Sequence, residues 1–267
     1  MTDASDPAAG SGIDTSVPHS ARIWNYWLGG KDNYSVDRAA GDSWTVIHPE
    51  IVVIARETRK FLHRSVRFVA GEAGVRQFLD VGTGLPTVDN THEVAQRMAP
   101  DARVVYVDND PLVLAHARAL LTSSPEGSTR YVHADMHDTQ ALVEEASKDL
   151  DLTQPVGVYF MGVLGHIADT AEARGIVQAL MERMPSGSYL TICDSTHPAE
   201  DEAFAQAQQE YADSGAVPYW NRTQAEIRSF FDGLEFIEPG FVSVPLWRPE
   251  IDDPEPLDHF GGVARKP

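Results

Sequence analysis

The sequence has almost no cysteine. Cys193 is the only one among 267 residues, which excludes an intramolecular disulfide and a cysteine-based zinc site and favours a reducing, cytoplasmic location. No apolar run approaches the roughly 18 residues of a transmembrane helix. The first 22 residues also lack the basic and apolar regions of a secretory signal peptide. We expect a protein without a membrane segment and without a bound metal.

Basic residues are scarce as well. The chain has 21 Lys and Arg against 40 Asp and Glu, so its formal net charge is −19. Such a surface repels nucleic-acid phosphates and anionic lipid headgroups, and neither is an expected partner. One basic cluster recurs at helical spacing: Arg56, Arg59, Lys60, Arg64 and Arg67. We interpret it as the solvated face of an amphipathic helix, and a local contact surface for nucleic acid is the alternative.

Hydrophobic residues, at 42%, suffice for a core, and the length fits one α/β domain of about 250 residues. Residues 1–21 are rich in Asp, Ser, Ala, Gly and Pro, so we expect a disordered tail there. Residues 22–267 are expected to form a single domain. It would consist of an N-terminal helical cap over 22–70 and a Rossmann-like core over 76–267.

From residue 76 onward, apolar runs typical of buried strands alternate with helical patterns. This alternation predicts an α/β fold with a mostly parallel sheet covered by helices on both faces. A capping box of Thr223 and Glu226 begins a late helix. Two strand-like runs flanking Pro239-Gly240 predict an antiparallel hairpin, and residues 259–267 a further edge strand. The expected strands of the parallel part are 76–82, 103–108, 129–135, 155–162 and 188–195, and the expected helices are 49–70, 92–99, 111–121, 139–147, 171–184 and 198–212.

The first expected strand leads into a turn with two glycines, in the stretch FLDVGTGLP. Glycine lets the backbone approach a ligand closely, and open parallel sheets bind ligands at this edge. A dinucleotide would bring a pyrophosphate, whereas S-adenosylmethionine brings an ammonium group and a sulfonium. The pattern favours the cationic ligand, because Asp80 precedes Gly82 and Gly84, and Thr87 stands where a dinucleotide site has its third glycine. A tight turn without a ligand is the alternative.

Acidic residues follow the second and third strands. Asp108 is a candidate acceptor for both hydroxyls of a ribose, whereas Asp110 is typical of a helix N-cap. Asp135 is a candidate acceptor for the adenine amine, with Met136 beside the ring; a solvated loop acid is the alternative.

His166 follows the fourth strand and Asp194 ends the fifth, at the same edge of the sheet. Either is a candidate general base for an acceptor that loses a proton. A structural role at a helix entrance is the alternative for His166.

Four stretches resemble, in order, the successive motifs of class I S-adenosylmethionine-dependent methyltransferases: FLDVGTGLP, VVYVDND, HADM and GVLGHI. Longer phrases, from ARIWNYWLGGKDNY to FFDGLEFIEPGFVSVPLWRP, resemble a subfamily of S-adenosyl methyltransferases formerly called a domain of unknown function. The resemblance covers nearly the whole chain after Ala21. It implies a three-layer sandwich around a seven-stranded sheet with a reversed last strand, and it implies no particular acceptor.

The resemblance also implies a cofactor site. It assigns the methionine portion of S-adenosylmethionine to Asp80, Gly82 and Gly84, the ribose to Asp108 and the adenine to Asp135. The product is then S-adenosylhomocysteine. Neighbouring residues complete the expected cofactor-binding set: Thr83, Asn109, Met136 and Gly162.

The segment 24–34 precedes the core and contains Gly29-Gly30 as a candidate hinge. We expect Tyr26, Lys31 and Asn33 to close over the cofactor, with Lys31 meeting its carboxylate. Simple packing of the segment onto the sheet is the alternative. A second aromatic cluster either walls an acceptor pocket or anchors a loop: Tyr211, Tyr219 and Trp220.

The sequence therefore predicts a methyltransferase that uses S-adenosylmethionine and acts on a small-molecule acceptor by direct displacement, with the protein aligning the reactants. Two other classes stay open. One is a cofactor-binding regulatory protein without turnover. The other is an NAD(P)-dependent oxidoreductase, for which the sequence offers no Tyr-x-x-x-Lys motif in the expected region. The sequence indicates no oligomeric state.

Overall fold

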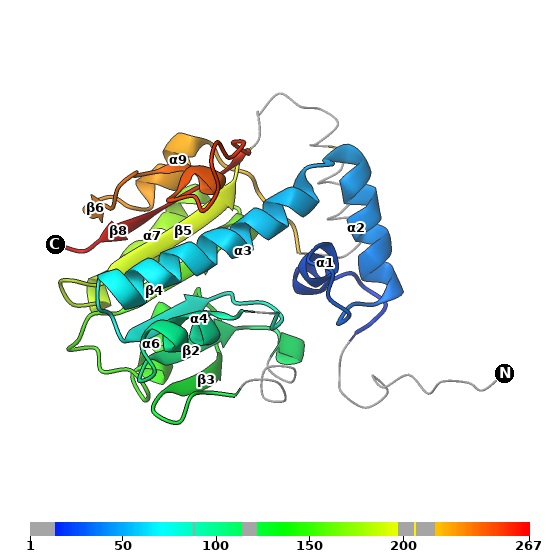
Figure 1. Ribbon diagram of the computed structural model, residues 1–267. Coiled ribbons are helices and arrows are strands. Elements are labelled where there is room, and N and C mark those ends of the chain that lie inside the picture. The colour runs from blue at the N-terminus through cyan, green and yellow to red at the C-terminus, as the bar shows by residue number, and fades with distance from the viewer. Residues whose placement is uncertain (1–13, 88, 114–121, 197–205, 207–216) are drawn as a thin grey trace.

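The computed structural model of the chain describes residues 14–87, 89–113, 122–196, 206 and 217–267 (Figure 1). Tyr211 lies outside the described residues, as do most of the expected helices over 111–121 and 198–212. Helix α1 (Ser20–Trp27) begins within the stretch expected to be a tail. His19 caps it, because its Nδ1 accepts a hydrogen bond from the backbone N–H of Ala21.

Five parallel strands form the centre of the sheet: β1 (Gln77–Val81), β2 (Arg103–Asp108), β3 (Ser128–His133), β4 (Gly157–Met161) and β5 (Tyr189–Ser195). Their order is β3-β2-β1-β4-β5. The chain starts at β1 in the middle, moves outward to β3, and returns to β4 on the other side of β1. The direction of winding therefore reverses between β1 and β4, and open α/β sheets bind ligands at the carboxyl ends of such strands.

Strand β8 (His259–Arg265) runs antiparallel to β5 and separates it from two short strands, β6 (Glu235–Phe236) and β7 (Val242–Ser243). The predicted hairpin is therefore wrong in its pairing, and β8 is not an edge strand. A turn around Pro239-Gly240 interrupts the strand between β6 and β7, and a hydrogen bond from Gly240 N to Ile237 O at 2.8 Å closes it. The chain then continues along the same neighbour, β8. With β6 and β7 taken as one interrupted strand, the sheet has seven positions and antiparallel C-terminal strands.

Helices cover both faces of the sheet. Alternate strand residues point to opposite faces, so Phe78 packs beneath α3 (Ile51–Arg67) and α4 (Thr91–Met98). Leu79 packs on the other side, beneath the helices α6 (Thr139–Ala146), α7 (Thr170–Arg183) and α9 (Gln224–Ser229). The α/β three-layer fold expected from the sequence is confirmed. The capping box of α9 is also present, since Thr223 Oγ1 accepts from Glu226 N.

Helix α3 joins the sheet to the N-terminal helices. Phe61 and Leu62 pack against the sheet, whereas Ile54 packs with Ile23 and Trp27 of α1. Helices α1 and α2 (Ser35–Ile47) lie together at the amino-terminal end of α3 (Figure 1). The division into a cap and a core stays a prediction, because α3 contributes to both. None of the helices described is long and apolar enough to span a membrane.

Candidate active site

The turn after β1 is built from two glycines with a left-handed backbone, Gly82 (φ 68°) and Gly84 (φ 67°). A side chain at Gly82 would collide with Val163, because a Cβ there would lie 2.2 Å from Cγ2 of Val163. The N–H of Gly82 donates to the carbonyl oxygen of Val107 at 2.8 Å and ties the turn to β2. Both the backbone conformation and the lack of space require glycine at residue 82.

Asp108, at the end of β2, holds this turn in place. Its Oδ2 accepts a hydrogen bond from Gly84 N, and its Oδ1 accepts one from Asp110 N, both at 2.9 Å. Burial raises the pKa of Asp108, and the two backbone donors oppose that rise. Each carboxylate oxygen has two acceptor positions, so the side chain can accept further bonds from a ligand. Asp110 accepts from Leu112 N at 2.8 Å, as expected of an N-cap.

A cavity of about 220 Å³ lies at this edge of the sheet. The ends of β1, β2 and β4, the helices α1 and α3, and residues of the segment 217–219 line it. The structure thus brings together many of the residues expected from the sequence, although their individual roles stay predictions. Those that line the cavity are Gly82, Thr83, Gly84, Asp108, Asn109, Met136, Gly162 and His166.

Asp80 lies behind this lining. Its side chain is buried, and Oδ2 accepts a hydrogen bond from Thr91 Oγ1 at 2.5 Å. Burial raises the pKa of Asp80 to about 6, although the bond from Thr91 and the charge of Arg59 lower it. The carboxyl group is therefore mostly ionised at neutral pH, and it acts on the cavity through its charge.

Asp135 was expected at the adenine, but it does not line the cavity. Its Oδ1 accepts from the backbone N–H of His137 at 3.0 Å, and the side chain of His137 lies on the same oxygen. These local partners hold the carboxylate at the surface, where the side chain is 54% exposed. A role of Asp135 at the adenine stays a prediction, as does the alternative of a solvated loop acid, whereas the adjacent Met136 lines the cavity.

Tyr26, Lys31 and Asn33 were expected to close over the cofactor, and none of them lines the cavity. The Tyr26 hydroxyl donates to Asp42 at 2.8 Å on the outer side of α1, and Lys31 is exposed. Asn33 Nδ2 donates to Oδ1 of Asn25 at 3.0 Å. Asn25 does line the cavity, so Asn33 acts by orienting a neighbour.

His166 has a defined tautomer. Its Nδ1 lies 3.0 Å from the carbonyl oxygen of Pro218. A carbonyl only accepts, so Nδ1 carries the proton and Nε2 keeps a lone pair in the neutral ring. Burial lowers the pKa of His166, which keeps the ring neutral at physiological pH. His166 is therefore an acceptor of protons or hydrogen bonds at the wall of the cavity.

Tyr219 stands edge-on to His166, with ring centroids 5.2 Å apart. It packs so closely on Gly165 that a Cβ there would lie 2.3 Å from the Tyr219 ring. Its hydroxyl donates to Oδ1 of Asp194, which is fully buried and does not line the cavity. Burial raises the pKa of Asp194 to about 7. Asp194, expected as a catalytic candidate, is thus separated from the cavity by Tyr219.

Helix α3 contradicts the interpretation of its basic residues as a solvated face. Arg56, Lys60 and Arg67 are exposed, but Arg59 lines the cavity. Arg64 is buried and donates to the carbonyl oxygens of Trp247 and Val244 at 2.8 and 2.7 Å. The guanidinium groups of Arg59 and Arg64 both donate to backbone carbonyl oxygens, which offsets the cost of removing their charge from water.

Sequence reasoning also missed how α1 contributes. Trp24 and Asn25 line the cavity, together with His19, whose Nε2 lies 3.4 Å from Asp110 Oδ2. The sequence analysis also did not identify Thr58 of α3 as a lining residue. Its spacing could have indicated this, because residues 54, 58 and 62 lie on one face of a helix and the outer two are apolar.

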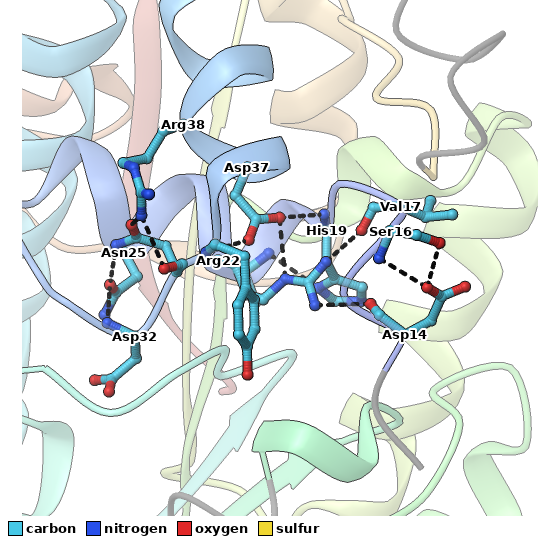
Figure 2. A network of polar contacts seen from close by, with 12 residues as sticks. Asp14, Ser16, Val17, His19, Arg22, Asn25, Asp32, Asp37 and Arg38 are labelled. Carbon is cyan, nitrogen blue, oxygen red and sulfur yellow. Dashed lines mark hydrogen bonds and ion pairs between the residues drawn. The ribbon is translucent and has the colours of Figure 1, made fainter. Parts of the chain in front are cut away.

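A buried acidic residue holds α1 in this position. Asp37 accepts hydrogen bonds from His19 N, Arg22 Nε and Tyr34 N at 2.8–3.0 Å. Figure 2 shows the Asp37 carboxylate pointing toward Arg22 and the backbone of His19, while the guanidinium of Arg22 also reaches Asp14 and Val17. Arg22 and Asp37 are both buried. The network fixes the residues before α1 and the start of α2 as one unit.

Comparison with known proteins identifies the family. The sequence model of the S-adenosyl methyltransferase family matches residues 6–267. The chain belongs to this family. A crystal structure of a DUF574 family protein from Streptomyces avermitilis is 44% identical, with a TM-score of 0.89 over 95% of this chain and 99% of that one. A proposed methyltransferase from Thermobifida fusca is 38% identical, with a TM-score of 0.84 over 96% and 97%.

More distant similarity supports the fold of this S-adenosyl methyltransferase. An O-methyltransferase family 2 protein from Planctomyces limnophilus, solved with apigenin, has a TM-score of 0.50 at 15% identity, over 92% of this chain and 65% of that one. No curated protein matches the chain. The methyl donor of the family is S-adenosylmethionine, and the comparisons give no support to an oxidoreductase or to a regulatory protein without turnover.

The cavity fits that cofactor chemically. A Cβ at Gly84 would meet only Ala21 Cβ, at 3.9 Å, so this glycine leaves room beside the turn, and Asp108 lines the cavity with a carboxylate that can accept from a ligand hydroxyl. Asp80 adds a negative charge behind the turn, which suits a ligand that carries an ammonium group and a sulfonium. A pyrophosphate would be repelled by the same two carboxylates.

Proposed function

We propose that the S-adenosyl methyltransferase transfers a methyl group to a small-molecule acceptor, with His166 as general base. The observation that carries the proposal is the environment of His166. The residue lines the same cavity as Gly82 and Asp108, and its bond to Pro218 O leaves Nε2 as the nitrogen with a lone pair. A buried neutral imidazole of this kind suits proton removal from a hydroxyl or amine.

Two features support an acceptor of small size. The cavity at the glycine turn is lined by aromatic and apolar side chains from two segments. Helix α1 and the residue after it contribute Trp24 and Leu28, and the segment 217–219 contributes Val217 and Tyr219. A nucleic acid would have to approach a chain of net charge −19. A concave site that combines aromatic and apolar side chains with polar groups that orient the ligand is typical of sites for small organic ligands.

The proposed roles follow from the contacts. Asp108 accepts hydrogen bonds from the ribose, and the backbone of residues 82–84 lies along the methionine portion. When bound, S-adenosylmethionine supplies an electrophilic methyl group and leaves as S-adenosylhomocysteine. His166 Nε2 takes the proton that the acceptor loses. Trp24 and Leu28 restrict the access of water, so that the protein mainly contributes alignment.

An acceptor screen tests the proposal. The enzyme is incubated with S-adenosylmethionine and, separately, with small hydroxyl, amine, thiol and carboxylic acid compounds, with duplex DNA, and with a mixture of unfolded proteins. Mass spectrometry then locates the added methyl group. We expect methylation of a small molecule, strongly reduced in His166→Gln and retained in His137→Gln, a control at an exposed histidine. Methylation confined to DNA or protein would overturn the proposal.

A further inference from the structure

A permanent cation, Arg59, lines the cavity. Of the described residues that line it, Arg59 is the single lysine or arginine, in a chain with nearly twice as many acidic as basic side chains. Arginine stays protonated in proteins, and its planar fork of N–H groups matches a carboxylate in a bidentate arrangement. A carboxylate that enters this cavity therefore has a strong partner in Arg59.

Arg59 lies at the end of the cavity assigned to the methionine portion. Its Nη2 donates to the carbonyl oxygen of Asp89 at 2.9 Å, on the loop between the glycine turn and α4. Asp108, assigned to the ribose, belongs instead to the end of β2.

The methionine portion of S-adenosylmethionine carries an ammonium group and a carboxylate on the same carbon. A site for this zwitterion needs a cation for the carboxylate, and Arg59 provides it among the described residues that line the cavity. We infer that Arg59 binds the carboxylate of the cofactor. This inference rests on the cofactor orientation proposed above, with the methionine portion at the glycine turn.

Arg59 thereby takes the role that Lys31 was expected to fill. Lys31 is exposed and outside the cavity lining, whereas Arg59 projects from α3 beside Thr58 and Leu62, which also line it. A guanidinium has five N–H donors, so one side chain can hold the loop at Asp89 and a ligand carboxylate at the same time.

A chemical double-mutant cycle tests the inference. Isothermal titration calorimetry measures binding of S-adenosylmethionine and of decarboxylated S-adenosylmethionine, which lacks only the carboxylate, to the wild type and to Arg59→Gln. We expect Arg59→Gln to weaken S-adenosylmethionine roughly 10- to 100-fold, as loss of a charge-assisted hydrogen bond would. Binding of the decarboxylated compound should change less than threefold. The coupling between the two changes isolates the contact.

Two further variants complete the design. Arg56→Gln removes an exposed arginine from the same helix and should affect neither ligand. Arg59→Lys keeps the charge and should fall between the wild type and Arg59→Gln, which keeps the test available if the glutamine variant folds poorly. Equal losses for both ligands, or no loss for either, would overturn the role of Arg59. Wild-type protein that binds both compounds equally well would instead overturn the orientation on which the inference rests.

Discussion

Oδ2 of Asp108 accepts a hydrogen bond from the backbone N–H of Gly84 at 2.9 Å. The residue that ends β2 thereby orients the turn that follows β1. The other oxygen, Oδ1, binds the N–H of Asp110 in the same way. One carboxylate therefore fixes two loops at the edge of the cavity. Because the same side chain is the proposed ribose ligand, cofactor binding and loop geometry depend on a single group.

Asp108→Asn should weaken both functions. An amide nitrogen cannot accept, so either Gly84 or Asp110 loses its partner, at a cost of about 1–3 kcal/mol. We expect the affinity for S-adenosylmethionine, measured by calorimetry, to fall roughly tenfold or more. Asp135→Asn is the matched control, because that carboxylate is exposed and bonded to His137. A comparable loss in Asp135→Asn would restore Asp135 as an adenine ligand.

The variants Gly82→Ala and Gly84→Ala distinguish two sources of lost stability, which are backbone strain at positive φ and steric overlap of the new Cβ with its neighbours. Both residues have positive φ, so each alanine should cost about 1 kcal/mol or more of unfolding free energy through backbone strain. At Gly84 the nearest neighbour of the new Cβ is Ala21 Cβ at 3.9 Å, whereas at Gly82 it is Val163 at 2.2 Å. Gly82→Ala should be the more destabilising in urea unfolding, and adding Val163→Ala should restore part of the loss. Equal effects without restoration would refute the collision.

The central strands could be predicted from the sequence because local patterns determine them. The stretch 77–81 is apolar apart from Gln77 and Asp80, and it lies in the middle of the sheet, buried on both faces. In contrast, the placement of β8 depends on which backbone groups it pairs with over long sequence distances, such as Leu190 with Ala264. The turn signal at Pro239-Gly240 therefore does not show that β6 and β7 both pair with β8 and not with each other.

The same distinction applies to the site. Gly82 and Asp108 follow neighbouring parallel strands, and any parallel sheet brings such strand ends together. Arg59 and Trp24 come from helices, and their access to the cavity depends on how α1 and α3 pack on the sheet. Helical periodicity shows which side of α3 faces the sheet, but it does not fix the rotation of the helix about its axis precisely. An arginine at the border between the buried and exposed sides can therefore not be assigned to either from the sequence. The charged surface face predicted for α3 was wrong for that reason.

Asp37→Asn should loosen the N-terminal helices. Asp37 is buried and pairs with the buried Arg22 at 3.0 Å, and removal of one partner of a buried ion pair typically costs about 3–5 kcal/mol. We expect faster hydrogen exchange in residues 20–47 and weaker S-adenosylmethionine binding, since α1 lines the cavity. Asp42→Asn, at an exposed carboxylate bonded to Tyr26, is the control. Unchanged exchange in Asp37→Asn would contradict a role of the network in holding α1.

Asp194 predicts a specific pH dependence of stability. Its pKa is raised by burial from 3.8 to about 7, so between these values the folded state binds a proton that the unfolded state does not. Its contribution to the unfolding free energy therefore decreases as the pH rises from about 4 to 7 and then levels off. The Asp194→Asn variant has no ionisable group at this position. The unfolding free energy of the variant minus that of the wild type should therefore be larger at pH 8 than at pH 5. Parallel pH curves for the two proteins, measured by urea unfolding, would contradict this assignment.

His166 predicts the pH dependence of turnover. A general base works only when unprotonated, and burial lowers the pKa of His166 below its ordinary 6.5. With a hydroxyl acceptor, kcat/KM should be constant at neutral pH and fall under acidic conditions with a midpoint below 6.5. His166→Asn should lower kcat by roughly 10²- to 10⁴-fold and abolish that acidic decline, while the affinity for S-adenosylhomocysteine stays within twofold. If the acidic decline persists in the variant, the titrating group is another one and His166 is not the base.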